Sequence, residues 1–402
     1  MRKILQINVC LNLSTGRIAQ SIGEAAMKHG WESYIAFSSR EPIVPCKSKV
    51  IKVGRFYDPY LHYIENRIFD REGLSSRRAT RKLIQQINDI QPDIIQLHNI
   101  HDHWLNYKLL FEFLNTTDIQ VVWTFHDCWA FTGHCFHFVT KKCERWKTGC
   151  YDCPLVHEYP NTILDRSTKN YALKKQLFKG CKNLTIVPCS DWMGDFVKKS
   201  FLNDKKIHVI KNGLDINVFR PSFKEQFLED GKCRILAVSN VWNKEKGLED
   251  IYELRNILPE DYLITIVGLT SEQVKTLPTG IMGIQRTQNV QELVELYSKS
   301  DVLINPTYAD TFPTINLEAL ACGTPVITYK TGGSPEAIDE KTGAVVDQGD
   351  VNALSEKIKE FMSYNFKRTH SEECRQRVIE MFDKDKCFEQ YITLYEDILE
   401  NK

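Results

Sequence analysis

Two carboxylates that flank a predicted helix start have the clearest chemistry in this chain of 402 residues. Asp310 lies in a polar loop after an apolar run, and Glu318 lies eight residues later, on the first turns of a helix that Pro313 is expected to open. Free N–H groups at residues 314–316 and the positive end of the helix dipole suit a phosphate or pyrophosphate. One carboxylate can reach a sugar beyond the phosphates while the other binds a ribose diol. Alternatively, Asp310 only begins the helix and Glu318 is a solvated charge.

Further polar residues follow apolar runs in the first half of the chain. His126 directly follows one such run, and His98 and His101 follow another. Gly16 stands near a predicted helix N-terminus, where the lack of a side chain allows a close backbone approach, and Arg17 adds a charge toward a phosphate. A lone histidine is more often a structural residue than a catalytic one, so these histidines alone do not define a site.

The elements that must position these residues alternate along the chain. Short Val- and Ile-rich runs without period-two alternation are separated by helical patterns, which is typical of buried parallel strands in an α/β protein. The series restarts after residue 210, which favours two Rossmann-like doubly wound domains facing each other across a cleft. We predict a first domain at residues 1–210, completed by a C-terminal helix within 386–402, and a second domain at 211–385. The predicted strands are residues 4–9, 34–37, 94–97, 121–125, 184–187, 235–238, 263–267, 302–304, 325–328 and 344–346, and the predicted helices are 18–29, 77–90, 169–178, 248–257, 290–298, 313–321, 351–362 and 386–400.

The composition excludes several classes of protein. The chain is 42% hydrophobic and 26% charged, which argues against disorder, and its 52 basic residues balance 52 acidic ones, which argues against broad capture of nucleic acid. We find no secretory signal and no apolar run long enough to span a membrane. We therefore expect a cytoplasmic protein, at most peripheral at the inner face of the cell membrane.

One segment, residues 53–76, carries five aromatic residues and leads into the basic residues of 77–82. We favour a helix or long loop that packs on the first domain and has a solvated basic face. The alternative is a surface that meets an amphiphilic substrate or anionic lipid headgroups.

Four of the 13 cysteines cluster within 19 residues of the first domain. Only the last pair has the short spacing of a zinc knuckle, and His134 and His137 are reserve ligands. A structural zinc site is the favoured interpretation, and free or disulfide-bonded cysteines are the alternative. The nine dispersed cysteines are expected to be small buried residues. The clustered cysteines are Cys135, Cys143, Cys150 and Cys153.

The second half of the chain resembles the retaining GT-B glycosyltransferases of family 4 (glycosyl transferases group 1), including those of capsule and colanic acid biosynthesis. Their Glu-x7-Glu signature appears as Asp310 and Glu318, and the second carboxylate begins the sequence EALACG. Further matches are KNGLD at 211–215, NVWNKEKG at 240–247 and TGGSPE at 331–336. The resemblance covers most of the second half and implies the GT-B fold, with the cysteine cluster as an insertion in the first domain.

The resemblance also implies roles for individual residues. Lys246 is expected to bind the donor diphosphate. The family usually has an arginine about five residues earlier, whereas this chain has Val241 there and Asn240 just before it, so Lys244 or Arg17 has to compensate for the missing charge.

Two further roles concern the transferred sugar. Asp310 is expected to contact the sugar hydroxyls with a reach one methylene shorter than glutamate, and His126 stands at the family's Thr-x-His-Asp position near the reaction centre. We therefore predict His126, Lys246 and Asp310 as catalytic, with His98 and His101 as second-rank candidates. The predicted donor-binding residues are Gly16, Arg17, Asn240, Lys246, Asp310, Thr311, Phe312, Pro313, Thr314, Ile315 and Glu318.

The implied reaction moves a hexose-type sugar from a UDP- or GDP-sugar to a glycan or lipid-linked acceptor in surface polysaccharide biosynthesis. The leaving diphosphate assists the acceptor hydroxyl, so no enzymic nucleophile and no catalytic cofactor are required. One alternative is a sugar-nucleotide epimerase or a phosphorylase of the same fold. Another is a zinc-ribbon protein that binds nucleic acid, which the neutral net charge argues against.

Overall fold

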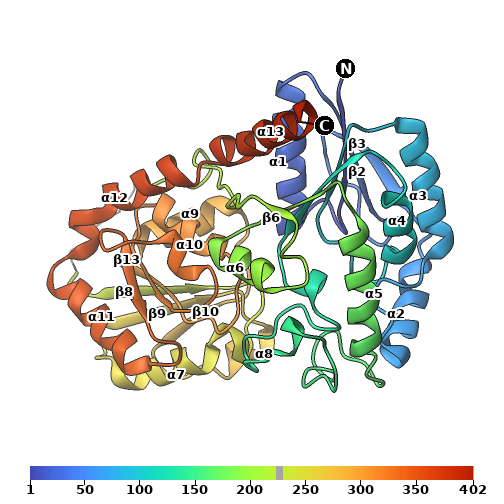
Figure 1. Cartoon of the computed structure of the whole chain (residues 1–402). Coiled ribbons are helices and arrows are strands. Elements are labelled where there is room, and N and C mark those ends of the chain that lie inside the picture. Colours follow the sequence, from blue (N-terminus) through green and yellow to red (C-terminus); the bar gives the residue numbers. More distant parts are fainter. Residues whose placement is uncertain (223–229, 402) are drawn as a thin grey trace. The chain divides into compact units, whose positions relative to one another are not determined.

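A computed structural model describes residues 1–222 and 230–401, which form two compact units. The first unit contains Met1–Lys211 and the C-terminal segment from Phe388, and the second contains Asn212–Cys387 (Figure 1). Each unit is built on one parallel sheet with helices between its strands, so the prediction of an α/β fold with two parallel sheets is confirmed.

The sheet of the first unit has seven parallel strands in the order β3-β2-β1-β4-β5-β6-β7. The order reverses between β1 and β4, and in such sheets ligands bind at the carboxyl ends of the strands beside this point. Five strands lie at predicted runs, whereas the edge strands β3 and β7 were not predicted. The strands are β1 (Lys3–Ile7), β2 (Glu32–Ser38), β3 (Lys49–Val53), β4 (Ile94–Leu97), β5 (Gln120–Phe125), β6 (Leu184–Pro188) and β7 (Lys206–Ile207).

Helices cover both faces of this sheet. Successive strand residues alternate between two cores: Ile4 and Val122 pack with α1 and α13, whereas Leu5 and Val121 pack with α3, α4 and α5. The predicted C-terminal helix is α13, whose Tyr395 is fully buried. The helices of this unit are α1 (Ser14–Lys28), α2 (Asp58–Phe69), α3 (Arg77–Ile90), α4 (Tyr107–Leu114), α5 (Ser167–Gly180) and α6 (Asp191–Lys199), and α13 (Lys384–Glu400) enters it from the second unit.

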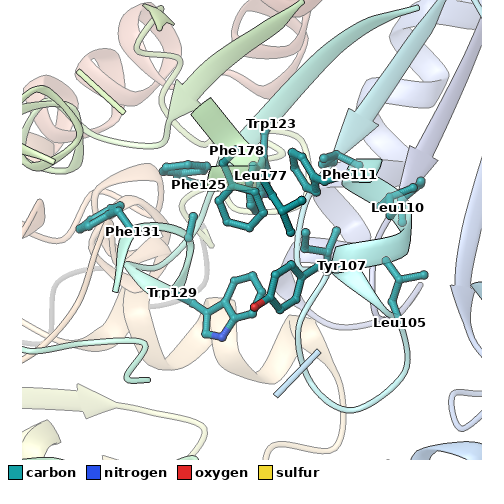
Figure 2. Close-up of a cluster of buried hydrophobic side chains, with 14 of the residues drawn as sticks. Leu105, Tyr107, Leu110, Phe111, Trp123, Phe125, Trp129, Phe131, Leu177 and Phe178 are labelled. Atoms are coloured by element: carbon teal, nitrogen blue, oxygen red, sulfur yellow. The ribbon is translucent and has the colours of Figure 1, made fainter. Parts of the chain in front are cut away.

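An aromatic core lies under the loop that follows β5 (Figure 2). Trp123 and Phe111 pack against Phe178, with ring centroids 5.0 and 4.4 Å from it. Burying one such side chain contributes roughly 1.5–3 kcal/mol. This core fixes the end of β5, and with it the backbone position of His126.

The sheet of the second unit has six parallel strands in the order β10-β9-β8-β11-β12-β13. Five strands lie at predicted runs, and β10 was not predicted. Its strands are β8 (Cys233–Val238), β9 (Tyr262–Val267), β10 (Ile281–Ile284), β11 (Val302–Asn305), β12 (Val326–Tyr329) and β13 (Gly343–Val346). Its helices are α7 (Leu248–Ile257), α8 (Ser271–Lys275), α9 (Val290–Lys299), α10 (Thr314–Ala321), α11 (Val351–Ser363) and α12 (Phe366–Met381), with short 3₁₀ turns η3 (Lys244–Lys246) and η4 (Ser334–Ala337).

Candidate functional site

In the second unit, Lys246 and Asp310 form an ion pair at the carboxyl edge of the sheet. The Lys246 Nζ lies 2.8 Å from Asp310 Oδ2 and 3.4 Å from the Ala309 carbonyl oxygen. The pair joins the loop after β8 to the loop after β11, and β8 and β11 are neighbouring strands. The structure thus brings together the lysine expected to bind a diphosphate and the first carboxylate of the signature.

Backbone contacts hold these two loops together. The Asn243 side chain accepts a hydrogen bond from the Lys246 N–H (3.1 Å), and the Tyr308 N–H donates to the Glu245 carbonyl (2.7 Å). Gly247 has a φ of +74°, and a Cβ there would lie 2.1 Å from the Pro306 carbonyl oxygen. Only glycine permits this approach, so the glycine after the lysine is a requirement of the loop geometry.

A second glycine sets the position of Asp310. Gly332 has a φ of +56°, and a Cβ on it would lie 1.7 Å from the Asp310 carbonyl oxygen. The Phe312 N–H donates to Asp310 Oδ1 (3.3 Å), which fixes the side chain at the start of the loop that leads to α10. The TGG sequence therefore supports the carboxylate from the neighbouring loop after β12.

The helix α10 begins at Thr314, and Pro313 at its N-cap position supplies no capping side chain. The first N–H groups of a helix have no intrahelical partner, so this end is suited to an anion. Glu318, on the second turn, is partly buried and accepts hydrogen bonds from the Tyr297 hydroxyl (2.9 Å) and the Thr314 hydroxyl (3.4 Å). Burial and the neighbouring Glu318 raise the pKa of Tyr297 well above its usual value, so Tyr297 stays a donor.

The other predicted donor residues lie on the same loops. Asn240 and Lys244 are exposed on the segment between β8 and α7, Thr311 and Ile315 are partly buried, and Phe312 is buried. Sequence reasoning did not identify Tyr297 or Asp250, which accepts hydrogen bonds from two tyrosine hydroxyls at 2.8 and 2.6 Å. No local pattern links these residues to the signature, because they lie on other helices and meet it only in the folded chain.

In the first unit, three side chains from neighbouring strands form a hydrogen-bonded row. Gln6 Oε1 lies 3.1 Å from His98 Nε2, and His98 Nδ1 lies 3.2 Å from His126 Nε2. Gln6 Nε2 donates to the Ala19 carbonyl (2.6 Å), so its oxygen faces His98. His98 then donates from Nε2 and accepts at Nδ1, which assigns the His126 proton to Nε2.

Burial keeps this row uncharged. Burial lowers the pKa of His126 to about 4 and that of His98 well below its ordinary value. His126 is therefore a neutral hydrogen-bonding group near pH 7. His101 pairs instead with Asp127, at 2.8 Å between Nε2 and Oδ2.

The two predicted residues of the first loop differ in environment. Gly16 is buried in α1, and a Cβ there would lie 2.4 Å from the Leu11 carbonyl carbon. The glycine is thus needed for the chain's own turn between β1 and α1. Arg17 is exposed.

The four clustered cysteines line one small cavity of about 10 Å³, together with His134. All 13 cysteines are free thiols. His134 Nδ1 lies 2.7 Å from Asp70 Oδ1, and its buried Nε2 has no hydrogen-bond partner among the residues that the structure describes. Thiolates and a carboxylate-oriented imidazole are typical zinc donors. However, in residues 1–222 and 230–401 no group of three or more His, Cys, Asp or Glu side chains is arranged to hold a metal ion. Zinc binding stays a prediction, and no catalytic step depends on it.

Comparison with known structures identifies the class of fold. Sucrose-phosphate synthase from Thermosynechococcus elongatus superimposes with a TM-score of 0.77 at 17% identity, covering 100% of both chains. Anabaena HepE, in a structure titled as a complex with UDP-glucose, gives a TM-score of 0.65 at 13% identity and covers 99% of this chain and 100% of its own. The chain has the GT-B fold, as predicted.

Matches to known sequence families identify the kind of enzyme. Residues 15–218 match Glycosyltransferase Family 4, and residues 219–380 match Glycosyl transferases group 1. The chain belongs to glycosyltransferase family 4 and is a glycosyltransferase. WcaC from Escherichia coli K12, whose name assigns it to colanic acid biosynthesis, is 26% identical over 327 residues, which cover 76% of this chain and 77% of WcaC. The sulfoquinovosyl transferase SQD2 of Arabidopsis thaliana is 28% identical over 190 residues, which cover 44% of this chain and 37% of SQD2.

Proposed function

We propose that this glycosyltransferase moves a hexose-type sugar, with retention of configuration, from a UDP- or GDP-sugar to a glycan or lipid-linked acceptor in surface polysaccharide biosynthesis. The observation that carries the proposal is the group formed by Lys246, Asp310 and Glu318 around the N-terminus of α10. The UDP-glucose complex of HepE supports the donor class, and the name of WcaC supports the pathway.

The donor diphosphate is assigned to Lys246 and to the N–H groups of Thr314 and Ile315. A positive side chain and a helix N-terminus both stabilise the charge that grows on the diphosphate as the sugar leaves. When the donor binds, Lys246 exchanges part of its contact with Asp310 for the phosphate, which frees Asp310 to accept hydrogen bonds from sugar hydroxyls.

The ribose diol is assigned to Glu318, which Tyr297 holds in place. A carboxylate accepts both hydroxyls of a vicinal diol, as in other nucleotide sites at the ends of parallel strands. In the first unit His126 contacts the transferred sugar as a neutral group, since its lowered pKa excludes a role as a cation. The leaving diphosphate takes the proton of the acceptor hydroxyl, and positioning supplies the rest of the rate enhancement.

A thermal-shift screen of nucleotide-sugars tests the donor class. A donor present at 100 times its Kd adds ~2.7 kcal/mol to the free energy of unfolding. We expect UDP- or GDP-sugars to stabilise the protein and the stabilising donor to be consumed in a transfer assay, with NMR showing the donor's anomeric configuration in the product. If neither nucleotide binds and no sugar is hydrolysed or transferred, the proposal is wrong. A product in which the anomeric configuration of the sugar is inverted would exclude the retaining mechanism.

A further inference from the structure

The helix α2 presents apolar side chains to solvent and polar ones to the protein. Tyr60, Leu61, Ile64 and Ile68 form one stripe on this helix, which we call the α2 stripe, and they are 55%, 62%, 53% and 38% exposed. The opposite side carries polar residues that are buried. Surface helices normally turn their apolar stripe toward the core, so α2 is inverted. A contiguous exposed apolar surface of this kind marks a contact with a membrane or a partner.

Hydrogen bonds fix α2 in this inverted orientation. His62 Nε2 accepts from the Gly73 N–H (3.1 Å), and His62 Nδ1 lies 3.1 Å from the Ser76 hydroxyl. Asn66 is buried beside the ring of His103, with 3.1 Å between Asn66 Nδ2 and His103 Nε2, and it adds packing rather than a hydrogen bond because His103 is charged. Turning the stripe inward would break these bonds and leave their buried partners unsatisfied. The exposed stripe is therefore built into the fold.

A neighbouring segment extends this apolar surface. The Ile163 and Leu164 N–H groups donate to the last carbonyls of α2, those of Arg67 (2.9 Å) and Ile68 (3.3 Å). The two side chains are 61% and 51% exposed. Residues from two distant parts of the chain thus form one apolar surface.

A cationic pocket adjoins the end of α2. It is a cavity of about 400 Å³ whose lining includes five positive side chains, which are Arg71, Arg77, Arg81, Lys108 and Arg166. Arg71 pairs with Glu65 at 2.9 Å, whereas neither Arg77 nor Arg81 has an ion-pair partner in the part of the chain that the structure describes. Arg71 lies two residues after the end of α2 and Arg166 lies two residues after Leu164, so the pocket has a lining residue close in sequence to each part of the apolar surface.

We propose that the α2 stripe and the cationic pocket together bind the surface of a bilayer that contains anionic lipid. The stripe enters the boundary between headgroups and acyl chains, its tyrosine stays at headgroup level, and the pocket receives headgroup phosphates. Charge favours this occupant over a second copy of the chain, because a symmetric contact through this surface would bring two cationic pockets together. None of the helices formed by the described residues has the length and apolar character needed to span a bilayer, so the contact is peripheral.

Sedimentation of the full-length protein with vesicles tests the inference. The vesicles are phosphatidylcholine with or without phosphatidylglycerol. We expect binding only when phosphatidylglycerol is present, and a fall in affinity of about tenfold or more in either Leu61→Glu/Ile64→Glu or Arg77→Glu/Arg81→Glu. The matched controls are Met282→Glu and Lys359→Glu, which change an exposed apolar residue and an exposed lysine of the second unit and are expected to bind as the parent does.

The inference is wrong if the protein binds neither kind of vesicle, if it binds both equally, or if the control variants lose binding as well. A dimer in analytical ultracentrifugation that Leu61→Glu/Ile64→Glu dissociates would make a second copy the occupant. The substituted positions are exposed, and circular dichroism checks that the variants are folded. UDP and GDP binding, measured in the same variants, separates a failure of this inference from a failure of the proposed function, because α2 and the donor loops belong to different units.

Discussion

Replacement of Lys246 by methionine removes the charge proposed for the donor diphosphate and keeps most of the side-chain volume. The Lys246 and Asp310 side chains are 31% and 23% exposed, so their ion pair contributes only about 0–1 kcal/mol to the free energy of unfolding. The variant is therefore expected to fold. A hydrogen bond to a charged group contributes roughly 1.5–3 kcal/mol when both partners are present, which corresponds to about a 10- to 150-fold loss in kcat/KM.

The assay measures kcat/KM for donor turnover and the Kd of the nucleoside diphosphate in parent and variant. The charge on the diphosphate increases as the bond to the sugar breaks, so kcat is expected to fall in addition to the donor affinity. Lys359→Met is the matched control, because Lys359 is an exposed cation of the same unit that lies on α11 and not on the η3 turn. A change below about twofold in Lys246→Met, or an equal loss in Lys359→Met, would refute the assignment of the diphosphate to Lys246.

Three further changes test other parts of the structure. Gly332→Ala should lower both the melting temperature and kcat/KM, because its Cβ would lie 1.7 Å from the Asp310 carbonyl oxygen. Burial disfavours the charged form of His103, but the carboxylates of Glu72 and Asp102 outweigh this effect and raise the pKa of His103 to about 9. The charged His103 therefore adds to the free energy of unfolding. This contribution is fully present below pH 6.5 and is lost as the pH rises toward 9. Urea unfolding at several pH values should show the loss in the parent protein and not in His103→Gln. Metal analysis should find about one zinc per chain, which Cys150→Ser abolishes.

Controls for these tests come from the same chain. Gly231→Ala also places alanine at positive φ (+73°), but its Cβ would meet no atom of the described residues within 4 Å, so an equal effect there would show that backbone strain alone acts at Gly332. Persistence of the alkaline destabilisation in His103→Gln would assign it to another group. Cys46→Ser, outside the cluster, should keep the metal, and metal-free protein purified without chelators would show that the clustered cysteines are simple thiols.

Most of the strands that the sequence revealed are buried on both faces. Residues 302–304 of β11, for example, are all apolar and all buried, and such a run can be recognised without knowledge of the fold. The strand β3 reads KVIKV, with mostly exposed residues, and β7 has only two residues, so neither has such a run. Both lie at sheet edges, where one face or one side stays in water.

The candidate site could be predicted as far as it is local in sequence. Asp310 lies on the loop before α10 and Glu318 lies on α10, so their spacing in the sequence alone indicates that they belong to one site. The contact of Gly332 with the Asp310 backbone and the hydrogen bond from Tyr297 to Glu318 join segments that meet only after the sheet has formed. Such contacts leave no periodic or spaced pattern in one sequence.

The environment of α2 shows why charge totals and periodicity do not decide function by themselves. The net charge of zero is compatible with a pocket lined by five cations, because the balancing acidic residues lie elsewhere. Periodicity locates the stripe containing Leu61 and Ile64 but does not say whether protein or another medium covers it. What decides this is the opposite face, where His62 makes two buried hydrogen bonds and Asn66 is buried. The apolar face is exposed because the polar face is needed inside. Among the described residues, the fold therefore leaves an apolar surface uncovered and two arginines of the pocket, Arg77 and Arg81, without an ion-pair partner.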